Sequence, residues 1–407
     1  MTLTAQVPRE ALHSALELYL DLHAHPELSG AEHRTADRFA AQLAHHGCTV
    51  SRGVGGGHGV VGVLHNGPGP TVLLRAELDA LPVPERTGLP YASTEPGVMH
   101  ACGHDLHLAA VAGAVGELSR TRARWSGNLL VVGQPAEETL TGARAMIDDG
   151  LYERFGTPAV AVAQHTAPLP AGTVAHVVPG APLMSGSTAL DVVIHGRGGH
   201  AGTPQLTVDP VLTAAATVVR LQSVVARETA PAEQVVLTVG SLRAGERANV
   251  IPDRAELSLC VRAFSEAALT RVAAAVERIV RAECAASACP RDPDFTVTSR
   301  SPALVPDEPA TAAVHRVHEE LFGPHRVGRT PALTATEDFP WFGTGEVRTV
   351  YWLLGVTGAQ QWRAARSGGP SVPPNHSPEF APDVRTALPT GIAAMASAAL
   401  HVLKETP

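Results

Sequence analysis

Charged residues and cysteines are scarce in this sequence, and long apolar runs are absent. Charged residues make up 17% of the chain, lysine is rare and the net charge is -8, which argues against a nucleic-acid partner. No apolar run reaches the ~18 residues of a membrane span, and the N-terminus lacks the basic start and apolar run of a signal peptide. The five cysteines are odd in number and scattered, as in reducing compartments. The sequence therefore predicts a cytoplasmic protein that binds neither nucleic acid nor membrane.

At 407 residues the chain is longer than one ordinary hydrophobic core needs, so two domains are expected. Apolar periodicity predicts helices over residues 9–25, 32–46, 106–118 and 142–151, and strands over 59–64, 71–75 and 128–133. The strands alternate with helices and their apolar runs are continuous, which indicates a sheet buried on both faces. The first part of the chain is therefore predicted to have an α/β fold.

Beyond Ser187 the expected elements follow a different order. They are a strand, a helix, two strands, a helix and a strand, over 189–195, 210–227, 234–240, 254–262, 266–283 and 295–298. This is the split order of a ferredoxin-like α+β domain with helices on one face of its sheet. Helix and strand patterns resume after Pro302 and end with a helix over 383–403. We therefore expect a discontinuous α/β domain, residues 1–186 and 300–407, interrupted by an inserted α+β domain over 187–299.

One segment of eight residues, His100-Ala-Cys-Gly-His-Asp-Leu-His107, contains three histidines, a cysteine and an aspartate. Imidazole and thiolate bind zinc and similar divalent metals, and a carboxylate beside a histidine commonly orients it. Cys102 and His104, two apart in a tight glycine-containing turn, could direct their ligand atoms to one site. Taken alone, the segment is also compatible with a histidine-rich surface loop and a buried cysteine.

Four further segments place reactive groups at the ends of expected strands or in a rigid loop. They carry Glu77 and Asp79, the adjacent Glu137 and Glu138, His165, and His376 in a proline-flanked loop. Ligands bind at the carboxyl ends of parallel strands in α/β sheets, so these groups are expected to meet. Adjacent residues of an extended segment face opposite ways, so one glutamate could bind a metal while its neighbour addresses a water. Each group taken singly is more often a surface, capping or packing residue.

Together the segments supply enough donors for two adjacent metal ions. The donors are Cys102, His104, Glu138, His165 and His376. Glu137 remains as a spare carboxylate. The set permits metal-assisted hydrolysis, in which the metals lower the pKa of a bound water and a carboxylate passes its proton to a leaving amine.

Six ordered motifs resemble those of the metal-dependent amidohydrolases, a group that includes bacterial hippurate hydrolase, N-acyl-amino-acid aminoacylases and plant auxin-conjugate amidohydrolases. The motifs are His100-Ala-Cys-Gly-His-Asp-Leu-His107, Gly133-Gln-Pro-Ala-Glu-Glu138, Gly198-Gly-His-Ala201, Asn249-Val-Ile-Pro252, Glu337-Asp-Phe339 and Asn375-His-Ser-Pro378. The similarity runs from His25-Pro-Glu-Leu28 to the last helix. It implies a di-metal catalytic domain with an inserted ferredoxin-like domain that serves as lid and dimerisation domain. The implied reaction cleaves the amide of an N-acyl amino acid or small conjugate into a carboxylic acid and a free amino acid.

The resemblance also implies roles for individual residues of the catalytic domain. The residues similar to the family's metal ligands are Cys102, His104, Glu138, His165 and His376. The Cys102 thiolate would bridge two divalent ions, zinc or manganese, with cobalt also possible. Glu137 resembles the family's general base, and Asp79 resembles the acidic residue that supports the metal site.

Three residues of the inserted domain complete the implied site. His200 resembles the histidine that stabilises the tetrahedral oxyanion, often across the interface of a homodimer. Its alternative is a turn-exposed histidine. Asn249 and Arg262 are candidates for holding a substrate carboxylate, although Arg262 could equally be a solvated strand residue.

The chain departs from the family pattern at two positions, and its sequence leaves three other functions to consider. The family usually has aspartate where this chain has Glu77, and it usually has histidine where this chain has Gln205, so substrate preference could differ. A dipeptidase or carboxypeptidase could use the same machinery. A non-catalytic metal-binding or ligand-binding protein would be expected to lack Glu137, which is present. A redox or zinc-storage role for Cys102 has little support, because the chain has no Cys-x-x-Cys pair.

Overall fold

The computed structural model describes residues 9–404, which form two compact units. The first unit runs up to residue 181 and includes 305–331 and the chain from residue 338 on. The second unit comprises Pro182–Leu304 and Ala332–Glu337. The expected insertion over 187–299 is thus shorter than the second unit, and the expected return to the first domain at residue 300 is interrupted. The cause is that Leu333 pairs with Leu183, so the short segment 332–337 packs with the second unit.

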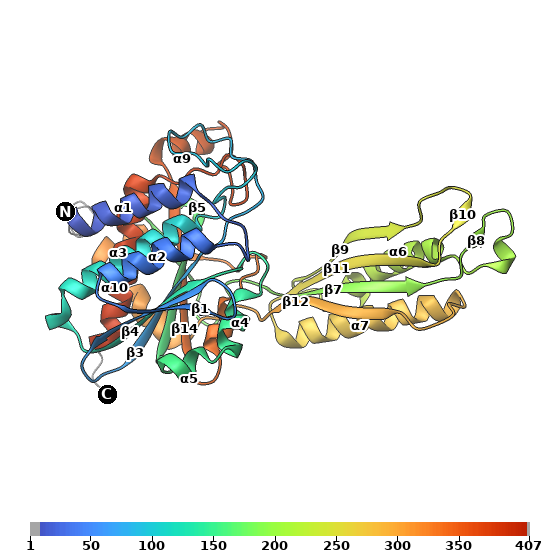
Figure 1. The fold of residues 1–407 in the computed structure, drawn as a ribbon, viewed down its shortest axis with the longest axis horizontal. Coiled ribbons are helices and arrows are strands. Elements are labelled where there is room, and N and C mark those ends of the chain that lie inside the picture. Colours follow the sequence, from blue (N-terminus) through green and yellow to red (C-terminus); the bar gives the residue numbers. More distant parts are fainter. Residues whose placement is uncertain (1–8, 405–407) are drawn as a thin grey trace. The chain divides into compact units, whose positions relative to one another are not determined.

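The first unit is built on a mixed eight-stranded sheet with the strand order β1-β2-β4-β3-β5-β14-β6-β13 (Figure 1). The strands are β1 (Thr49–Val54), β2 (Gly59–Asn66), β3 (Thr71–Glu77), β4 (Gly127–Gln134), β5 (Val160–Pro170), β6 (Val174–Val177), β13 (Val327–Thr330) and β14 (Arg348–Thr357). The central strands β4, β3, β5 and β14 are mutually parallel. Almost every residue of β3 and β4 is buried, so the prediction of a sheet covered on both faces is confirmed here.

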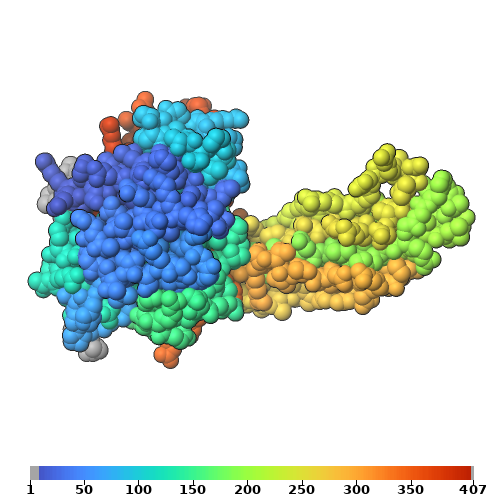
Figure 2. Space-filling model, in the orientation of Figure 1, coloured from blue at the N-terminus to red at the C-terminus, as the bar shows by residue number. Residues whose placement is uncertain are grey.

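Helices and short 3-10 turns enclose this sheet. The helices are α1 (Arg9–Ala24), α2 (His33–His45), α3 (His104–Arg120), α4 (Gly142–Asp148), α5 (Leu151–Phe155), α8 (Glu308–Phe322), α9 (Ala359–Arg366) and α10 (Val384–Lys404). In the space-filling view, α1 and α2 lie on the surface of the unit, in blue (Figure 2). By contrast α3 and α10 pack on each other and on the central strands, and most of their residues are buried. α10 is long and apolar enough to span a membrane by composition, yet 78% of that stretch is buried inside the unit, as in a core helix.

Two expected elements differ in extent from the observed ones. The helix expected over 142–151 is divided into α4 and α5 at Gly150, whose φ of 79° ends a right-handed helix. The strand expected to end at His165 continues as β5 to Pro170, because β14 pairs with it along that length. His165 therefore lies within a strand rather than at its end.

The second unit has an antiparallel four-stranded sheet with the order β12-β7-β11-β9 and two helices, α6 and α7, along it (Figure 1). The elements in chain order are β7 (Gly186–His195), α6 (Pro210–Arg227), β9 (Val235–Ala244), β11 (Arg254–Ala263), α7 (Glu266–Ala286) and β12 (Asp294–Ser301). Burial alternates along β7 and β11, so one face of the sheet packs against the helices. A separate two-stranded ribbon joins β8 (Gly199–His200) to β10 (Val250–Ile251).

Candidate metal centre

Cys102, His104 and His165 converge at the carboxyl ends of the central strands. β3, β4 and β5 are parallel, so their ends reach the same edge of the sheet, where the loop before α3 also lies. One ligand atom from each of these three residues lies within 4.8 Å of the others. The Cys102 Sγ is 3.4 Å from the His165 Nε2. The structure therefore brings these three residues together, as the sequence predicts.

A second set of donors, Cys102, Glu138 and His376, shares the cysteine with the first. Their ligand atoms also lie within 4.8 Å of one another, and the His376 Nε2 is 3.4 Å from the Glu138 Oε1. The His104 Nε2 lies 3.9 Å from the same carboxylate oxygen, which is too long for a hydrogen bond. Ligands of one cation bound at about 2.0–2.3 Å are themselves roughly 3–4 Å apart, so these spacings suit shared divalent ions. A mixture of thiol, imidazole and carboxylate is also a donor set that such ions favour. Cys102 is buried, Glu138 is partly buried and His376 is exposed.

Asp79 supports this centre from the end of β3. Its backbone oxygen and its Oδ1 lie 2.8 and 3.2 Å from the His104 Nδ1, which leaves the other ring nitrogen facing the carboxylates. Its Oδ2 accepts hydrogen bonds from the Ser29 hydroxyl at 2.7 Å and the Glu138 amide at 2.9 Å. Asp79 thus links His104 on α3 to Glu138, which follows β4. It also links both to Ser29 in the turn after α1.

Glu137 and Glu138 lie in a turn, which corrects the expectation of an extended segment with opposed side chains. Ala136 has a φ of 52° and the Leu140 amide donates to the Glu137 carbonyl at 2.7 Å, so the backbone reverses here. Both carboxylates face the same imidazole, with the Glu137 Oε2 3.7 Å from the His104 Nε2. The Glu137 carboxylate therefore lies beside the candidate ligands.

Burial sets the protonation of two candidate ligands. It lowers the pKa of His165 to about 3, so this imidazole is neutral and able to coordinate. Burial, followed by the charge of Glu138, raises the pKa of the Cys102 thiol. A divalent cation would reverse that effect, because a coordinated thiol loses its proton.

A buried ion network beneath the metal centre was not foreseen from the sequence. Arg75 on β3 pairs with Glu77 and with Asp338, and the Asp338 carboxylate accepts from Gln134 at 2.7 Å. Burial opposes ionisation of Glu77, but Arg75 and then His107 hold its pKa well below the usual range. The local signal that could have revealed the network is an arginine inside an otherwise apolar strand, since such a buried charge needs an acidic partner.

The three site residues expected in the second unit fall into two places. His200 and Asn249 are exposed and lie together on the β8–β10 ribbon, where the Ala201 amide donates to the Asn249 carbonyl at 3.1 Å. Arg262 is half-buried on β11, and its Nη1 donates to the Thr334 carbonyl and the Thr336 hydroxyl, both at 3.0 Å. Arg262 therefore supports the 332–337 segment.

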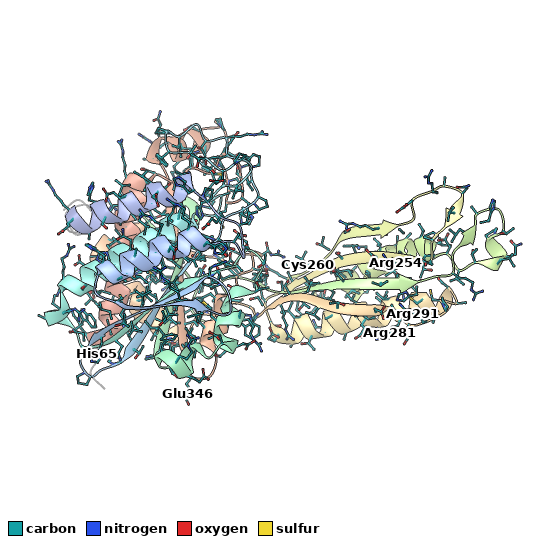
Figure 3. All side chains as sticks on the ribbon, viewed as in Figure 1. His65, Arg254, Cys260, Arg281, Arg291 and Glu346 are labelled. Carbon is teal, nitrogen blue, oxygen red and sulfur yellow. The ribbon has the colours of Figure 1, made fainter. Side chains whose placement is uncertain are left out.

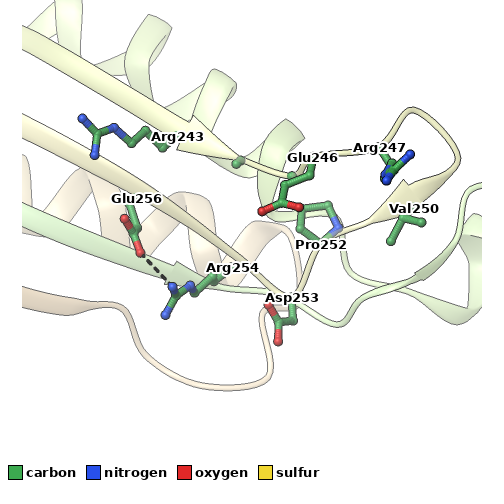
Figure 4. A pocket seen from close by; sticks show the side chains of 10 residues that line it. Arg243, Glu246, Arg247, Val250, Pro252, Asp253, Arg254 and Glu256 are labelled. Atoms are coloured by element: carbon green, nitrogen blue, oxygen red, sulfur yellow. Dashed lines mark ion pairs between the residues drawn. The ribbon is translucent and has the colours of Figure 1, made fainter.

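A cavity of about 450 Å³ lies beside this ribbon, between the ends of β9 and β11. It is lined by three arginines and three acidic residues: Arg243, Arg247, Arg254, Glu246, Asp253 and Glu256. Arg254 is paired with Glu256, and the three guanidinium groups point in different directions (Figure 4). The cavity has no convergent set of charges for one anion.

Cys260, labelled on β11 in Figure 3, is one of five free thiols.

The centre around Cys102 combines groups that could hold divalent ions with an adjacent carboxylate, as is typical of metal-dependent hydrolases. Residues 73–401 match the model of the peptidase family M20/M25/M40, and the chain belongs to this family. It is a metal-dependent amidohydrolase.

Named relatives and a solved structure agree with this assignment. The chain is 35% identical over 326 residues to hippurate hydrolase of Campylobacter jejuni, covering 79% of this chain and 82% of that protein. It is 31% identical over 371 residues to thermostable carboxypeptidase 1 of Saccharolobus solfataricus, with 90% of each covered. It is also 31% identical to IAA-amino acid hydrolase ILR1-like 2 of Arabidopsis thaliana, covering 94% and 84%. The structure of the YXEP protein of Bacillus subtilis, a dinuclear metal binding peptidase, is similar with a TM-score of 0.78, 27% identity and coverage of 98% and 100%.

Proposed function

We propose that this enzyme hydrolyses the amide bond of N-acyl amino acids or related small conjugates, giving a carboxylic acid and a free amino acid. The observation that carries the proposal is the Glu137 carboxylate, 3.7 Å from the His104 Nε2 within a buried set of metal-binding groups. The likeness to hippurate hydrolase and to an IAA-amino acid hydrolase supports a small acylated amino acid as substrate.

The ligands we propose are Cys102, His104, Glu138, His165 and His376. Two divalent ions held there would polarise the scissile carbonyl and lower the pKa of the attacking water. Zinc or manganese suits this set, and cobalt is a workable substitute. Asp79 orients His104 through the bonds to its Nδ1.

Glu137 takes a proton from the attacking water on its carboxylate and passes it to the leaving nitrogen. His200 donates a hydrogen bond to the oxyanion that forms on the carbonyl oxygen. Asn249, beside His200 on the same ribbon, holds the substrate carboxylate, with Arg262 as a further candidate. The reaction balances as amide plus water giving acid plus amine.

We further propose that the second unit is a ferredoxin-like lid and dimerisation domain inserted into a catalytic domain. Its strand order β12-β7-β11-β9, with α6 and α7 along the sheet, supports the first part. The second part is supported by α6, which leaves Leu212 and Val219 69% and 74% exposed, seven residues apart on one helical face. A second copy of this chain is the partner we propose for that face. The free thiols suit a cytoplasmic location.

A carboxypeptidase or dipeptidase activity is the second candidate, because the chain is also similar to thermostable carboxypeptidase 1 over nearly its whole length. The two reactions use the same groups and differ in the acyl part. A panel that compares acetyl, benzoyl and long-acyl amino acids with dipeptides separates them.

The decisive experiment measures amine release from that panel by the wild type and by Glu137→Gln, with metal content determined for both. We expect wild-type turnover of acylated amino acids and a loss of about 10²–10⁴-fold in Glu137→Gln with about two metals retained. Metal retained in both proteins without turnover of any amide would contradict the proposal. Absence of metal from both would contradict the site itself.

The position of His200 is tested by mixing inactive subunits. If His200 completes the site of the partner subunit, dissociated and re-equilibrated mixtures of His200→Ala and Glu137→Ala regain up to about a quarter of wild-type activity. Each variant incubated with itself is the control. No regain in the mixture would mean that His200 acts within its own subunit or not at all.

A further inference from the structure

Thr166, the residue after His165 on β5, is buried and is hydrogen-bonded to His165, to His107 on α3, to the Cys102 loop and to Asn375. Its carbonyl, hydroxyl and amide each have a different partner. The carbonyl oxygen accepts from the His165 Nδ1 at 2.8 Å. Because this bond requires a proton on Nδ1, it leaves the Nε2 lone pair free on the side of Cys102.

The Thr166 hydroxyl joins two segments that are 273 residues apart in sequence. It donates to the Cys102 carbonyl at 2.6 Å and accepts from the Asn375 Nδ2 at 3.1 Å. The Asn375 Nδ2 also lies 3.3 Å from the Cys102 carbonyl and from the Thr166 carbonyl. The neighbouring His376 amide donates to the Ala101 carbonyl at 2.8 Å, so the loop with this candidate ligand is bound to the loop with Cys102.

The Thr166 amide extends the contacts into the buried ion network. It donates to the His107 Nε2 at 2.9 Å, and the His107 Nδ1 in turn lies 2.7 Å from the Glu77 Oε2. Glu77 is paired with Arg75. The Glu77 carboxylate is therefore linked to β5 through His107. Thr166 cannot move without breaking hydrogen bonds of its amide, its hydroxyl or its carbonyl.

We propose that Thr166 is the positioning residue of the metal centre, and that its hydroxyl, together with Asn375, fixes Cys102 and His376 relative to His165. The inference rests on the ligand set proposed above. The tight packing supports it, because a Cβ at Gly103 would lie 2.7 Å from both the Thr166 Oγ1 and the Thr166 Cγ2. In a site fixed in this way, metal binding does not have to order the segments that carry Cys102, His165 and His376, so less conformational entropy is lost on binding.

The test uses Thr166→Val, which keeps the shape, amide and carbonyl but removes the hydroxyl, with Thr166→Ser as the matched control. Metal-free protein is titrated with cobalt while the thiolate-to-cobalt absorption is recorded, and kcat and KM are measured on the best substrate of the panel. We expect Thr166→Val to bind cobalt 10–100-fold more weakly with a reduced thiolate band, and Thr166→Ser to stay within about threefold of the wild type. KM should change less than kcat, because the hydroxyl acts through the ligands.

Asn375→Ala provides a second variant if Thr166→Val folds poorly, which the melting temperature of the metal-free proteins reveals. The loss of cobalt affinity in Thr166→Val/Asn375→Ala should be smaller than the product of the two single losses, because both residues act on the same contact. Wild-type affinity and an unchanged thiolate band in both single variants would overturn the inference while leaving the metal centre intact. A wild type that shows no thiolate band would overturn the metal centre and this inference together.

Discussion

At the scale of single residues, the metal centre depends on backbone conformations that few residues adopt. Gly103 has a φ of 82° immediately before α3, and His376 has a φ of 69° without being glycine. Left-handed conformations cost an ordinary residue about 1–2 kcal/mol, so such positions persist where the surroundings hold them. In this chain they accompany two donor groups that share Cys102, one with His104 and His165 and the other with Glu138 and His376.

Gly103→Ala tests this requirement. The new methyl group would add a contact at 2.7 Å with Thr166 to the left-handed strain, so we expect a loss of about 3 kcal/mol or more in unfolding free energy. Gly97→Ala is the matched control, because Gly97 has a φ of 78° with open space around its Cβ position, and it should lose about 1 kcal/mol. Urea unfolding of both proteins measures the difference. Equal losses would show that the Thr166 contact relaxes at no cost.

At the scale of elements, three buried histidines join β6, α8 and α10 at a distance from the metal centre along the sheet. The His176 Nε2 lies 3.0 Å from the His318 Nδ1, and the His318 Nε2 lies 3.1 Å from the Ala394 carbonyl. Two neutral rings satisfy this pattern when His318 donates from Nε2 to Ala394 and accepts on Nδ1 from His176. Burial lowers the pKa of His318 to about 4, and burial together with His318 and His315 holds the pKa of His176 well below its usual range.

The packing of these elements is therefore predicted to be acid-labile. The folded-state pKa of His318 lies below its unfolded value of about 6.5, so its contribution is present above pH 6.5 and is lost as the pH falls toward 4. We expect protonation of this histidine to lower the free energy of unfolding by about 2 kcal/mol between pH 7 and pH 5. His318→Gln, which keeps a donor and an acceptor but does not titrate, should reduce the pH dependence of urea unfolding by that amount. The exposed His13→Gln serves as control, and an unchanged slope in His318→Gln would refute the assignment.

At the scale of the whole molecule, the chain passes four times between its two units, and each unit has its own hydrophobic core. The first core surrounds the central sheet, with residues such as Leu74, Val131 and Val162. The second core lies between one sheet face and the helices α6 and α7. The proposed metal ligands belong to the first unit, and the exposed apolar face of α6 belongs to the second.

Dimerisation through α6 is tested by Leu212→Glu/Val219→Glu. Two charges on this face should prevent burial of an apolar interface, so we expect the sedimenting mass to fall from two chains to one. Val305→Glu is the control, because Val305 is 52% exposed but belongs to the first unit. A double variant that sediments with the mass of the wild type would contradict this interface.

Removal of metal is expected to affect stability as well as activity. Cys102, His104 and Glu137 are buried close together only in the folded chain. A cation that binds the folded and not the unfolded state raises the free energy of unfolding, by about 4 kcal/mol when its concentration is 1,000 times its dissociation constant. A chelator should lower the melting temperature by several degrees and abolish amide hydrolysis. Zinc, manganese or cobalt should restore both. An unchanged melting temperature after verified metal removal would contradict this coupling.

Local sequence patterns predicted most helices, the central strands β3, β4 and β5, and the residues of the candidate metal centre. Apolar periodicity depends on near neighbours, and the spacing of Cys102 and His104 already limits where their side chains can meet. The strands β6, β13 and β14 and the helices α8 and α9 were not delimited from the sequence. Their pairing and packing partners are distant in the chain, so local patterns carry little information about their ends.

Tertiary structure alone decided how the ligands are held. Arg75 reads as a polar interruption of a strand, yet its charge is compensated by Asp338, which lies 263 residues away. Thr166 carries no local signal, and the Asn375-His-Ser-Pro378 motif does not reveal the contacts of its asparagine, because these contacts arise only where β5, the Cys102 loop and the His376 loop meet. Residue chemistry thus predicted which groups could bind a metal or transfer a proton, while long-range hydrogen bonds and ion pairs hold these groups in place.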